Sequence, residues 1–245
     1  MITALSHPED IRREVDWDYN RSHYWFVKHF HGYNGYHEKG QEMASKREFY
    51  AKDYLRSELI EYRSPKTGNL WLSYNIATES KERPGWTKVT NHNVCYYETG
   101  AYMGLLTRSI SVNEDGKDVL TIIHYTPHMF MRFATRMAEQ GHPLDMTDRR
   151  KIAVNFCENY ATSIFEARTP HKNRKKKDRD IVVRLPASFI RGDMYRYDDH
   201  TALITFRTFY TDATLTDFQR EDLEELADYI DNKKYEQDNS KESGY

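Results

Sequence analysis

The spacing of apolar residues changes twice along the chain, and each spacing predicts different elements. Residues 1–58 have a helical pattern that opens at the capping box Ser6-x-x-Glu9, with Pro8 inside the first turn. A second helix is expected near residues 40–58. This region therefore predicts an N-terminal helical subdomain.

Residues 59–124 consist of short runs rich in β-branched and aromatic residues. Turn signals separate the runs, for example Thr67-Gly68-Asn69. This spacing predicts an antiparallel meander.

The last region, residues 125–245, mixes helical and strand-like spacing. It predicts helices over about 127–140 and 147–167 and strands near 180–185, 187–197 and 201–211. An acidic helix is expected to open at Thr216-x-x-Gln219, and residues 234–245 are expected to form a disordered acidic tail. The fold class is then α+β, with an antiparallel meander sheet packed against helices over residues 59–233 and the helical subdomain before it.

Composition narrows the class of protein. Apolar residues make up 38% of the 245 residues, charged residues 30% and aromatic residues 14%. Mean hydropathy is −0.89 and no apolar run approaches the roughly 18 residues of a membrane span, so we expect no membrane partner. With no visible secretory signal and only Cys95 and Cys157 as thiols, we expect a cytoplasmic protein without disulfides.

The net charge of −2 hides a separation of charge along the sequence. Residues 168–179 carry seven Lys or Arg against one Asp, whereas residues 217–245 carry ten acidic against four basic residues. The basic run is either a solvated loop or a phosphate-binding patch. Its candidate contacts to phosphate or nucleic acid are Lys172, Arg174, Lys175, Lys176 and Lys177.

Metal and nucleotide motifs are missing from the sequence. His124 and His128 are four residues apart, but Pro127 starts a helix between them and breaks the geometry of a helical zinc pair. The sequence has no HExxH, GxGxxG, GxxxxGK or GxSxG pattern. We therefore expect neither a metal nor a cofactor.

A polar stripe marks the helix expected over 127–140. His128, Arg132 and Arg136 lie at i, i+4 and i+8 on one face. The positive end of the helix disfavours imidazolium, so His128 is expected to stay neutral and to accept a proton, while the two guanidiniums could clamp a phosphate. The alternative is a solvated basic face.

The strand near 201–211 carries several hydroxyls. Alternation places Thr205 and Arg207 on one face, together with Phe209. Thr208 then faces the other side. The strand either lines a site or is an ordinary threonine-rich strand.

Two sequence segments, TPHMFMRFATRM at 126–137 and ITFRTFYT at 204–211, resemble the barnase/EndoU/colicin/RelE-like superfamily of metal-independent ribonuclease toxins. The resemblance covers about residues 118–212. It implies that His128 is the catalytic base, Arg132 stabilises phosphate and Thr208 is the strand hydroxyl, with Thr205 in that role if the other face points inward.

The resemblance implies cleavage of RNA. Neutral His128 would deprotonate a ribose 2′-OH, which attacks its own phosphodiester, while Arg132 and Arg136 stabilise the developing charge. Arg207 is a further candidate contact to phosphate or nucleic acid.

A second hypothesis is a non-enzymatic bacterial or phage protein that binds or regulates through aromatic and basic surfaces. Between Trp17 and His37 lie eight aromatic residues and four histidines. They form either a stacking platform for single-stranded bases, or a protein-binding surface, or the packing of a helix on a sheet. The enzyme needs His128, an arginine and a strand threonine in one concave pocket; a solvent-facing His128 without a neighbour favours the binding protein.

Overall fold

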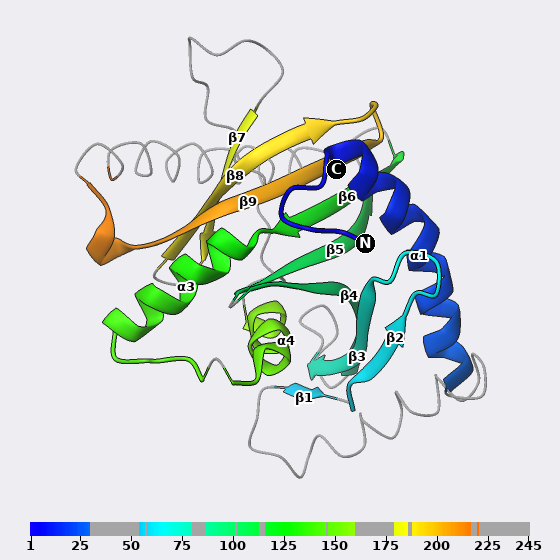
Figure 1. The fold of residues 1–245 in the computed structure, drawn as a ribbon, viewed down its shortest axis with the longest axis horizontal. Helices are drawn as coiled ribbons and strands as arrows, with labels where there is room; N and C mark the ends of the chain where they lie inside the picture. The colour runs from blue at the N-terminus through cyan, green and yellow to red at the C-terminus, as the bar shows by residue number, and fades with distance from the viewer. Residues whose placement is uncertain are drawn as a thin grey trace, which may run out of the picture.

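A single mixed sheet dominates the described part of the chain, which comprises residues 1–29, 54–56, 58–79, 87–100, 102–112, 116–145, 147–159, 179–185, 188–216 and 220 of a computed structural model (Figure 1). These ranges contain nine strands: β1 (Tyr54–Arg56), β2 (Ile60–Arg63), β3 (Leu70–Glu79), β4 (Thr87–Thr99), β5 (Tyr102–Val112), β6 (Asp118–Tyr125), β7 (Arg179–Leu185), β8 (Ser188–Arg196) and β9 (Thr201–Thr211). Their order is β1-β3-β4-β5-β6-β9-β8-β7, and β2 also pairs with β3.

The expected antiparallel meander is confirmed from β2 to β6, where every consecutive pair is antiparallel. The sheet becomes mixed where β6 pairs with β9 in parallel, with Ile122 opposite Leu203. A parallel pair needs a long connection, and here the described part of the chain between β6 and β7 contains two helices before β7, β8 and β9 follow. The strands predicted near 180–185, 187–197 and 201–211 are thereby confirmed.

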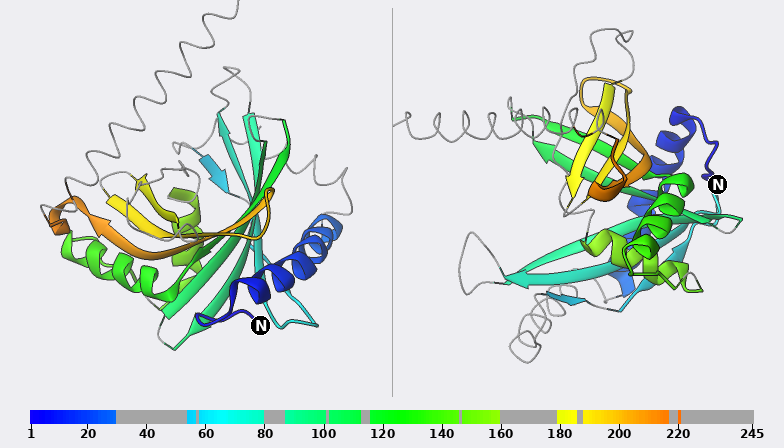
Figure 2. Two further views of the ribbon diagram at one scale, coloured as in Figure 1. Left: turned by 90° about the horizontal axis from the view of Figure 1, so that it is seen from above. Right: turned by 90° about the vertical axis from the view of Figure 1, so that its left-hand side faces the viewer.

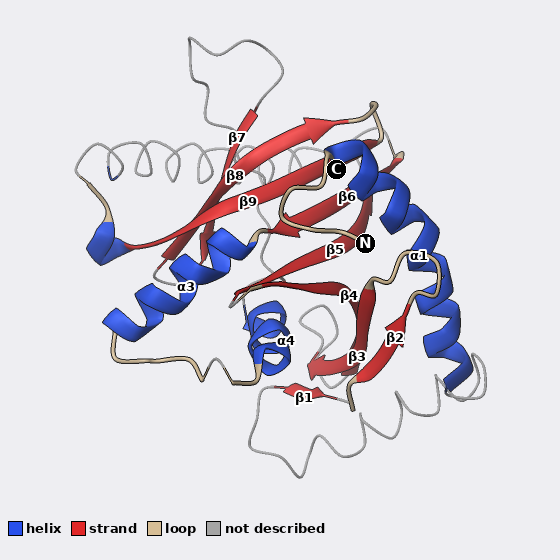
Figure 3. Cartoon of the chain, in the orientation of Figure 1, coloured by secondary structure: helices blue, strands red, loops and turns tan. Residues whose placement is uncertain are grey.

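The described helices are α1 (Pro8–His29), α3 (Pro127–Glu139) and α4 (Arg149–Asn159), and a short 3-10 turn, η2 (Asp212–Thr214), follows β9 (Figure 3). The predicted start of α3 is confirmed, because the Thr126 hydroxyl accepts a hydrogen bond from the Met129 amide and Pro127 occupies the first turn.

The start of α1 is in the expected place, but the expected capping box is wrong. The Ser6 hydroxyl accepts a hydrogen bond from the Thr3 amide at 2.9 Å. The Glu9 amide instead donates to Nδ1 of His7, 3.4 Å away. Ser6 therefore orders the turn that precedes the helix.

Several expectations fall partly or wholly outside the described residues. Of the helix expected near 40–58, residues 54–56 form strand β1 instead, and 40–53 lie outside the described ranges. The helix expected over 147–167 is described only as α4. Most of the basic run 168–179, nearly all of the last helix and the tail 234–245 are likewise not described.

Helices lie on both faces of the sheet (Figure 2). On one face, the main core joins α3 and α4 to the strands through Phe130, Phe133, Phe156 and Phe206, among others. On the opposite face, Ile11 and Val15 of α1 pack in a second cluster with residues of β3, β4, β5, β6 and β9. Helix α1 thus shares its hydrophobic core with the sheet.

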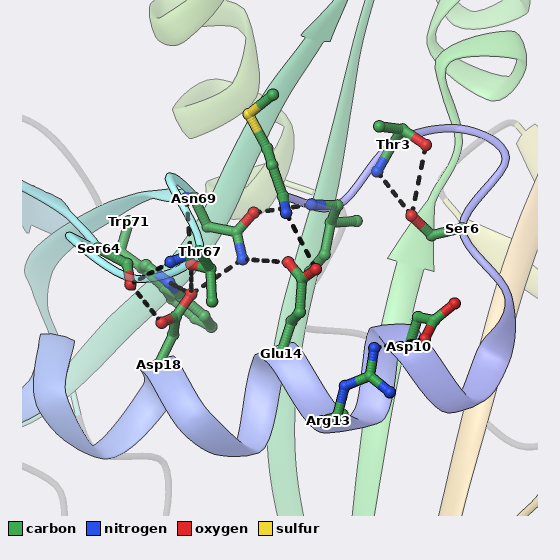
Figure 4. A network of polar contacts seen from close by, with 12 residues as sticks. Thr3, Ser6, Asp10, Arg13, Glu14, Asp18, Ser64, Thr67, Asn69 and Trp71 are labelled. Carbon is green, nitrogen blue, oxygen red and sulfur yellow. Dashed lines mark hydrogen bonds and ion pairs between the residues drawn. The ribbon is translucent and has the colours of Figure 1, made fainter.

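A buried carboxylate fastens α1 to the turn between β2 and β3 (Figure 4). Asp18 has no exposed surface. It accepts hydrogen bonds from Ser64 Oγ at 2.6 Å, Thr67 Oγ1 at 2.5 Å, Asn69 Nδ2 at 2.9 Å and Trp71 Nε1 at 3.4 Å. Four donors offset the loss of water around this charge, so the helix cannot shift without leaving a buried carboxylate short of partners.

We expect Asp18→Asn to lower the free energy of unfolding by about 3 kcal/mol, because hydrogen bonds to a buried charge are lost and an amide nitrogen then faces other donors. Urea denaturation measures this change. Asp16→Asn is the matched control: Asp16 is on the same helix and pairs with Arg12 across 3.7 Å in solvent, so its loss should cost no more than about 0.5 kcal/mol. Equal losses in the two variants would contradict the anchoring role.

Candidate functional site

The polar stripe predicted on α3 points away from the core. The side chains of His128 and Arg132 are exposed, and neither makes a hydrogen bond or an ion pair with any described residue. Arg136 is half-buried and pairs with Glu139 across 2.8 Å. The stripe therefore forms a solvated face of the helix, and Arg136 is already engaged by a carboxylate.

A β-bulge sets the orientation of the threonines in β9. Thr208 is opposite Arg191 and Phe206 is opposite Gly192, so Arg207 has no partner in the ladder. Phe206 and Phe209 consequently both belong to the core under α3, although they are three residues apart. The prediction that Phe209 shares a face with Thr205 and Arg207 is therefore wrong, because strict alternation does not continue through a bulge.

The bulge also places Thr208 on the face of the sheet that α3 does not cover. Thr208 is two residues from Tyr210, which packs with Val182 and Phe189 in a cluster separate from the α3 core. The structure thus leaves His128 and Arg132 on one side of the sheet and Thr208 on the other. The pocket that the ribonuclease mechanism needs is not assembled from these three residues.

Of the remaining predicted site residues, Arg207 and Thr205 lie on β9. Arg207 is paired with Asp193 across 2.6 Å, with 64% of its side chain exposed. Thr205 lies opposite His124 in the parallel register of β6 and β9. The basic residues Lys172, Arg174, Lys175, Lys176 and Lys177 lie outside the described ranges.

Sequence reasoning considered His124 only as a metal ligand and missed its contact with Tyr97. His124 is 2% exposed, and its Nε2 lies 2.6 Å from the Tyr97 hydroxyl. The Tyr97 ring crosses the backbone of Gly104, where an added Cβ would lie 2.2 Å from the ring. Gly104 is the local sequence signal for this contact. Because it has no side chain, it leaves room on β5 for the Tyr97 ring of β4 to reach His124 on β6.

Burial sets the protonation of this pair. Desolvation, with a smaller contribution from the Arg207 charge, lowers the pKa of His124 to about 4, and burial raises the pKa of Tyr97. Neutral imidazole and phenol together offer a matched donor and acceptor. The contact satisfies His124 Nε2 and the Tyr97 hydroxyl with each other, and because both groups are buried it has the features of a structural contact.

The strongest candidate site is an aromatic flank of α1. Trp17, Tyr24 and Trp25 are 38%, 70% and 38% exposed, and together with Arg21 they fall on one side of the helix. By contrast, Phe26 is buried against Ile60 of β2. Within α1, the N-terminal aromatic cluster thus contains both a buried ring and solvent-exposed rings. The members of the cluster from residue 30 onward lie outside the described ranges.

Tyr24 and Trp25 border a shallow groove of about 490 Å³ between α1 and β2. The residues that line it are Asn20, Arg21, Tyr24, Trp25 and Tyr62. The ring centroids of Trp25 and Tyr62 are 5.9 Å apart, with an angle of 39° between the rings. We call Trp17, Tyr24, Trp25, Tyr62, Arg21 and the neighbouring Lys66 the aromatic surface.

Two cations on this surface share one ring. The Arg21 guanidinium carbon lies 3.9 Å from the Trp17 ring centroid, and the Lys66 Nζ lies 3.0 Å from it. Neither cation forms an ion pair with a carboxylate in the described part of the chain. Arg21 Nη1 donates to the Trp17 carbonyl oxygen at 2.7 Å, which fixes the guanidinium beside the ring.

A second hollow, of about 420 Å³, lies at the start of α4, but its charges are matched internally. It is lined by Glu98, Thr147, Asp148, Arg149 and Arg150. Arg149 pairs with Glu98 across 3.6 Å, and Arg150 pairs with Glu61 of β2. These pairs join α4 to the sheet and leave less uncompensated charge for a ligand than the aromatic surface does.

Metal-binding and membrane-spanning features are not found within the described ranges. No three His, Cys, Asp or Glu side chains there are close enough together to hold a metal ion. No helix in these ranges has the length and apolar character needed to cross a bilayer. The chain matches no protein-family model, no curated protein and no solved structure.

The protonation of His124 predicts a loss of stability in acid. Unfolded histidine binds a proton near pH 6.5, whereas folded His124 resists it until about pH 4. The unfolded state therefore binds more protons in this window, and stability is lost as the pH falls through it, by about 3 kcal/mol in total. Urea denaturation at a series of pH values measures the slope.

The control for this experiment is His200→Gln, which removes an exposed histidine and should leave the pH slope unchanged. His124→Gln should flatten the slope, leaving only the smaller contribution of groups such as His92, whose pKa is also lowered by burial. A slope that is the same in His124→Gln and the wild type would contradict this account.

Proposed function

We propose that the chain is a non-enzymatic binding protein whose aromatic surface binds single-stranded nucleic acid, with RNA as the first ligand to test. The observation that carries this proposal is the groove between α1 and β2, where aromatic rings are exposed close to two cations that have no carboxylate partner among the described residues. Proteins that hold single strands combine these two features.

Stacking on a nucleobase would explain why these rings are exposed, whereas packing within the fold does not. Tyr24 and Trp25 remain exposed although α1 already buries another face on the sheet, so their exposed area stabilises nothing within the described fold. A nucleobase stacked on the exposed side of Trp25 or Tyr24 would cover ring area that the fold leaves open. Such stacking tolerates any base, because every base has a π-face.

The cations distinguish this ligand from a protein partner. Exposed Trp and Tyr also occur in protein interfaces. Arg21, however, lines the groove, and Lys66 adds a second positive charge at the neighbouring Trp17 ring, which favours a polyanion. Binding of the surface to a protein and not to an oligonucleotide is an outcome that would overturn the proposal.

The exposed position of His128 supports this proposal over the ribonuclease hypothesis. A general base must lie within reach of its substrate and of the groups that stabilise charge. His128 and Arg132 have no described partner, and Thr208 is on the other face of the sheet.

Trp25→Ala should weaken the binding of a short labelled single-stranded RNA by about tenfold to a hundredfold, since stacking contributes roughly 1–3 kcal/mol per base. Fluorescence anisotropy at fixed salt measures the dissociation constant. Tyr195→Ala is the matched control, because Tyr195 is also 38% exposed but lies on β8. The proposal fails if wild type binds neither RNA nor DNA single strands, or if both variants bind equally well.

Purified wild-type protein should leave total RNA intact during incubation, and His128→Ala should give the same result. Gel electrophoresis of the RNA provides the measurement. Cleavage by the wild type that His128→Ala abolishes would instead restore the ribonuclease hypothesis, in which His128 acts as the base.

A further inference from the structure

The two cations beside Trp17 come from different elements and meet at one indole. Arg21 lies one helical turn beyond Trp17 on α1, whereas Lys66 lies in the turn between β2 and β3. Two cations within 4 Å of one ring centroid concentrate positive charge at this indole. The π-face of Trp17 attracts both of them, and a bound anion could interact with both.

We infer that Arg21 and Lys66 form a phosphate-binding bracket around Trp17, distinct from the base-stacking groove formed by Tyr24, Trp25 and Tyr62. This inference rests on the proposed function for its ligand, which is the sugar–phosphate backbone of a single strand. A guanidinium stacked on a ring keeps N–H donors at its edge, and an ammonium keeps rotatable donors, so both can still bind phosphate oxygens.

The bracket differs from the two arginines in the first turns of α1. Arg12 pairs with Asp16 and Asp198, and Arg13 pairs with Asp10 across 2.6 Å, so their charges are compensated. Arg21 has an aromatic ring and a backbone carbonyl as its partners. No carboxylate of the described ranges compensates its positive charge, which is therefore available to an anion there.

The fold holds the two cations in place. Ser64 and Thr67 are in the same turn as Lys66 and both donate to buried Asp18, which is three residues before Arg21 on α1. The relative position of the turn and the helix is thus fixed by the buried Asp18 carboxylate. Preorganised donors of this kind lose little freedom when a ligand binds.

The bracket is tested by the salt dependence of single-stranded RNA binding. Arg21→Gln and Lys66→Gln should each reduce the slope of log affinity against log salt concentration by about 0.7, because each removes one phosphate contact to a single strand. Trp25→Ala should lower affinity without changing the slope. Lys66→Arg retains the charge and should keep the slope of the wild type.

Arg13→Gln and Lys151→Gln are the matched controls, since both remove an exposed cation that is paired with a carboxylate. Their slopes should equal that of the wild type. If RNA binds and Trp25→Ala weakens it, but Arg21→Gln and Lys66→Gln keep the slope of the wild type, the bracket is overturned while the proposed function stands.

An abasic oligonucleotide of the same length separates the two sites further. It should compete with RNA for the wild type and lose this ability in the Arg21→Gln, Lys66→Gln double variant. Competition by the abasic strand combined with no effect of Trp25→Ala would support the bracket and overturn the stacking groove. Absence of any binding of either oligonucleotide to the wild type would overturn both.

Discussion

The burial of one carboxylate, Asp18, determines how the N-terminal helix sits on the sheet. A charge without solvent is tolerated only where donors surround it, and here all four donors come from the β2–β3 turn and the start of β3. The helix is therefore held in both rotation and translation along its axis. Ile11 and Val15 are directed into the core as a result, and the flank that carries Trp17 and Trp25 remains beside β2.

The two faces of the sheet differ in the residues that they bury. The α3 face is an aromatic core in which Phe133 meets Phe209 edge to face at 5.1 Å, and this leaves only the outer surface of α3 for polar residues. The α1 face contains the Asp18 network and the His124–Tyr97 pair. A site that combines a residue on the outer surface of α3 with one on the α1 face would have to reach through a packed core, which explains why His128 and Thr208 do not meet.

Local signals in the sequence predicted much of the fold but little of the site. Thr126 and Pro127 predicted the start of α3 because a cap and a first-turn proline act within a few residues. The bulge at Arg207 was not predictable from β9 alone, because a bulge is defined by the register of the partner strand. The same holds for His124 and Tyr97, and for Lys66 and Trp17, which meet only after β-strands have paired.

The aromatic surface is a property of the folded chain and not of its aromatic content. Of the eight aromatic residues between Trp17 and Tyr36, Phe26 faces Ile60 and is buried, whereas Trp25, its neighbour in sequence, faces Tyr62 and solvent. One residue turns a helix by about 100 degrees, so a dense aromatic segment supplies both a core and an exposed face once the helix axis is fixed. Asp18 fixes the position and rotation of that helix. It thereby determines which rings are covered by the sheet and which remain exposed to a ligand.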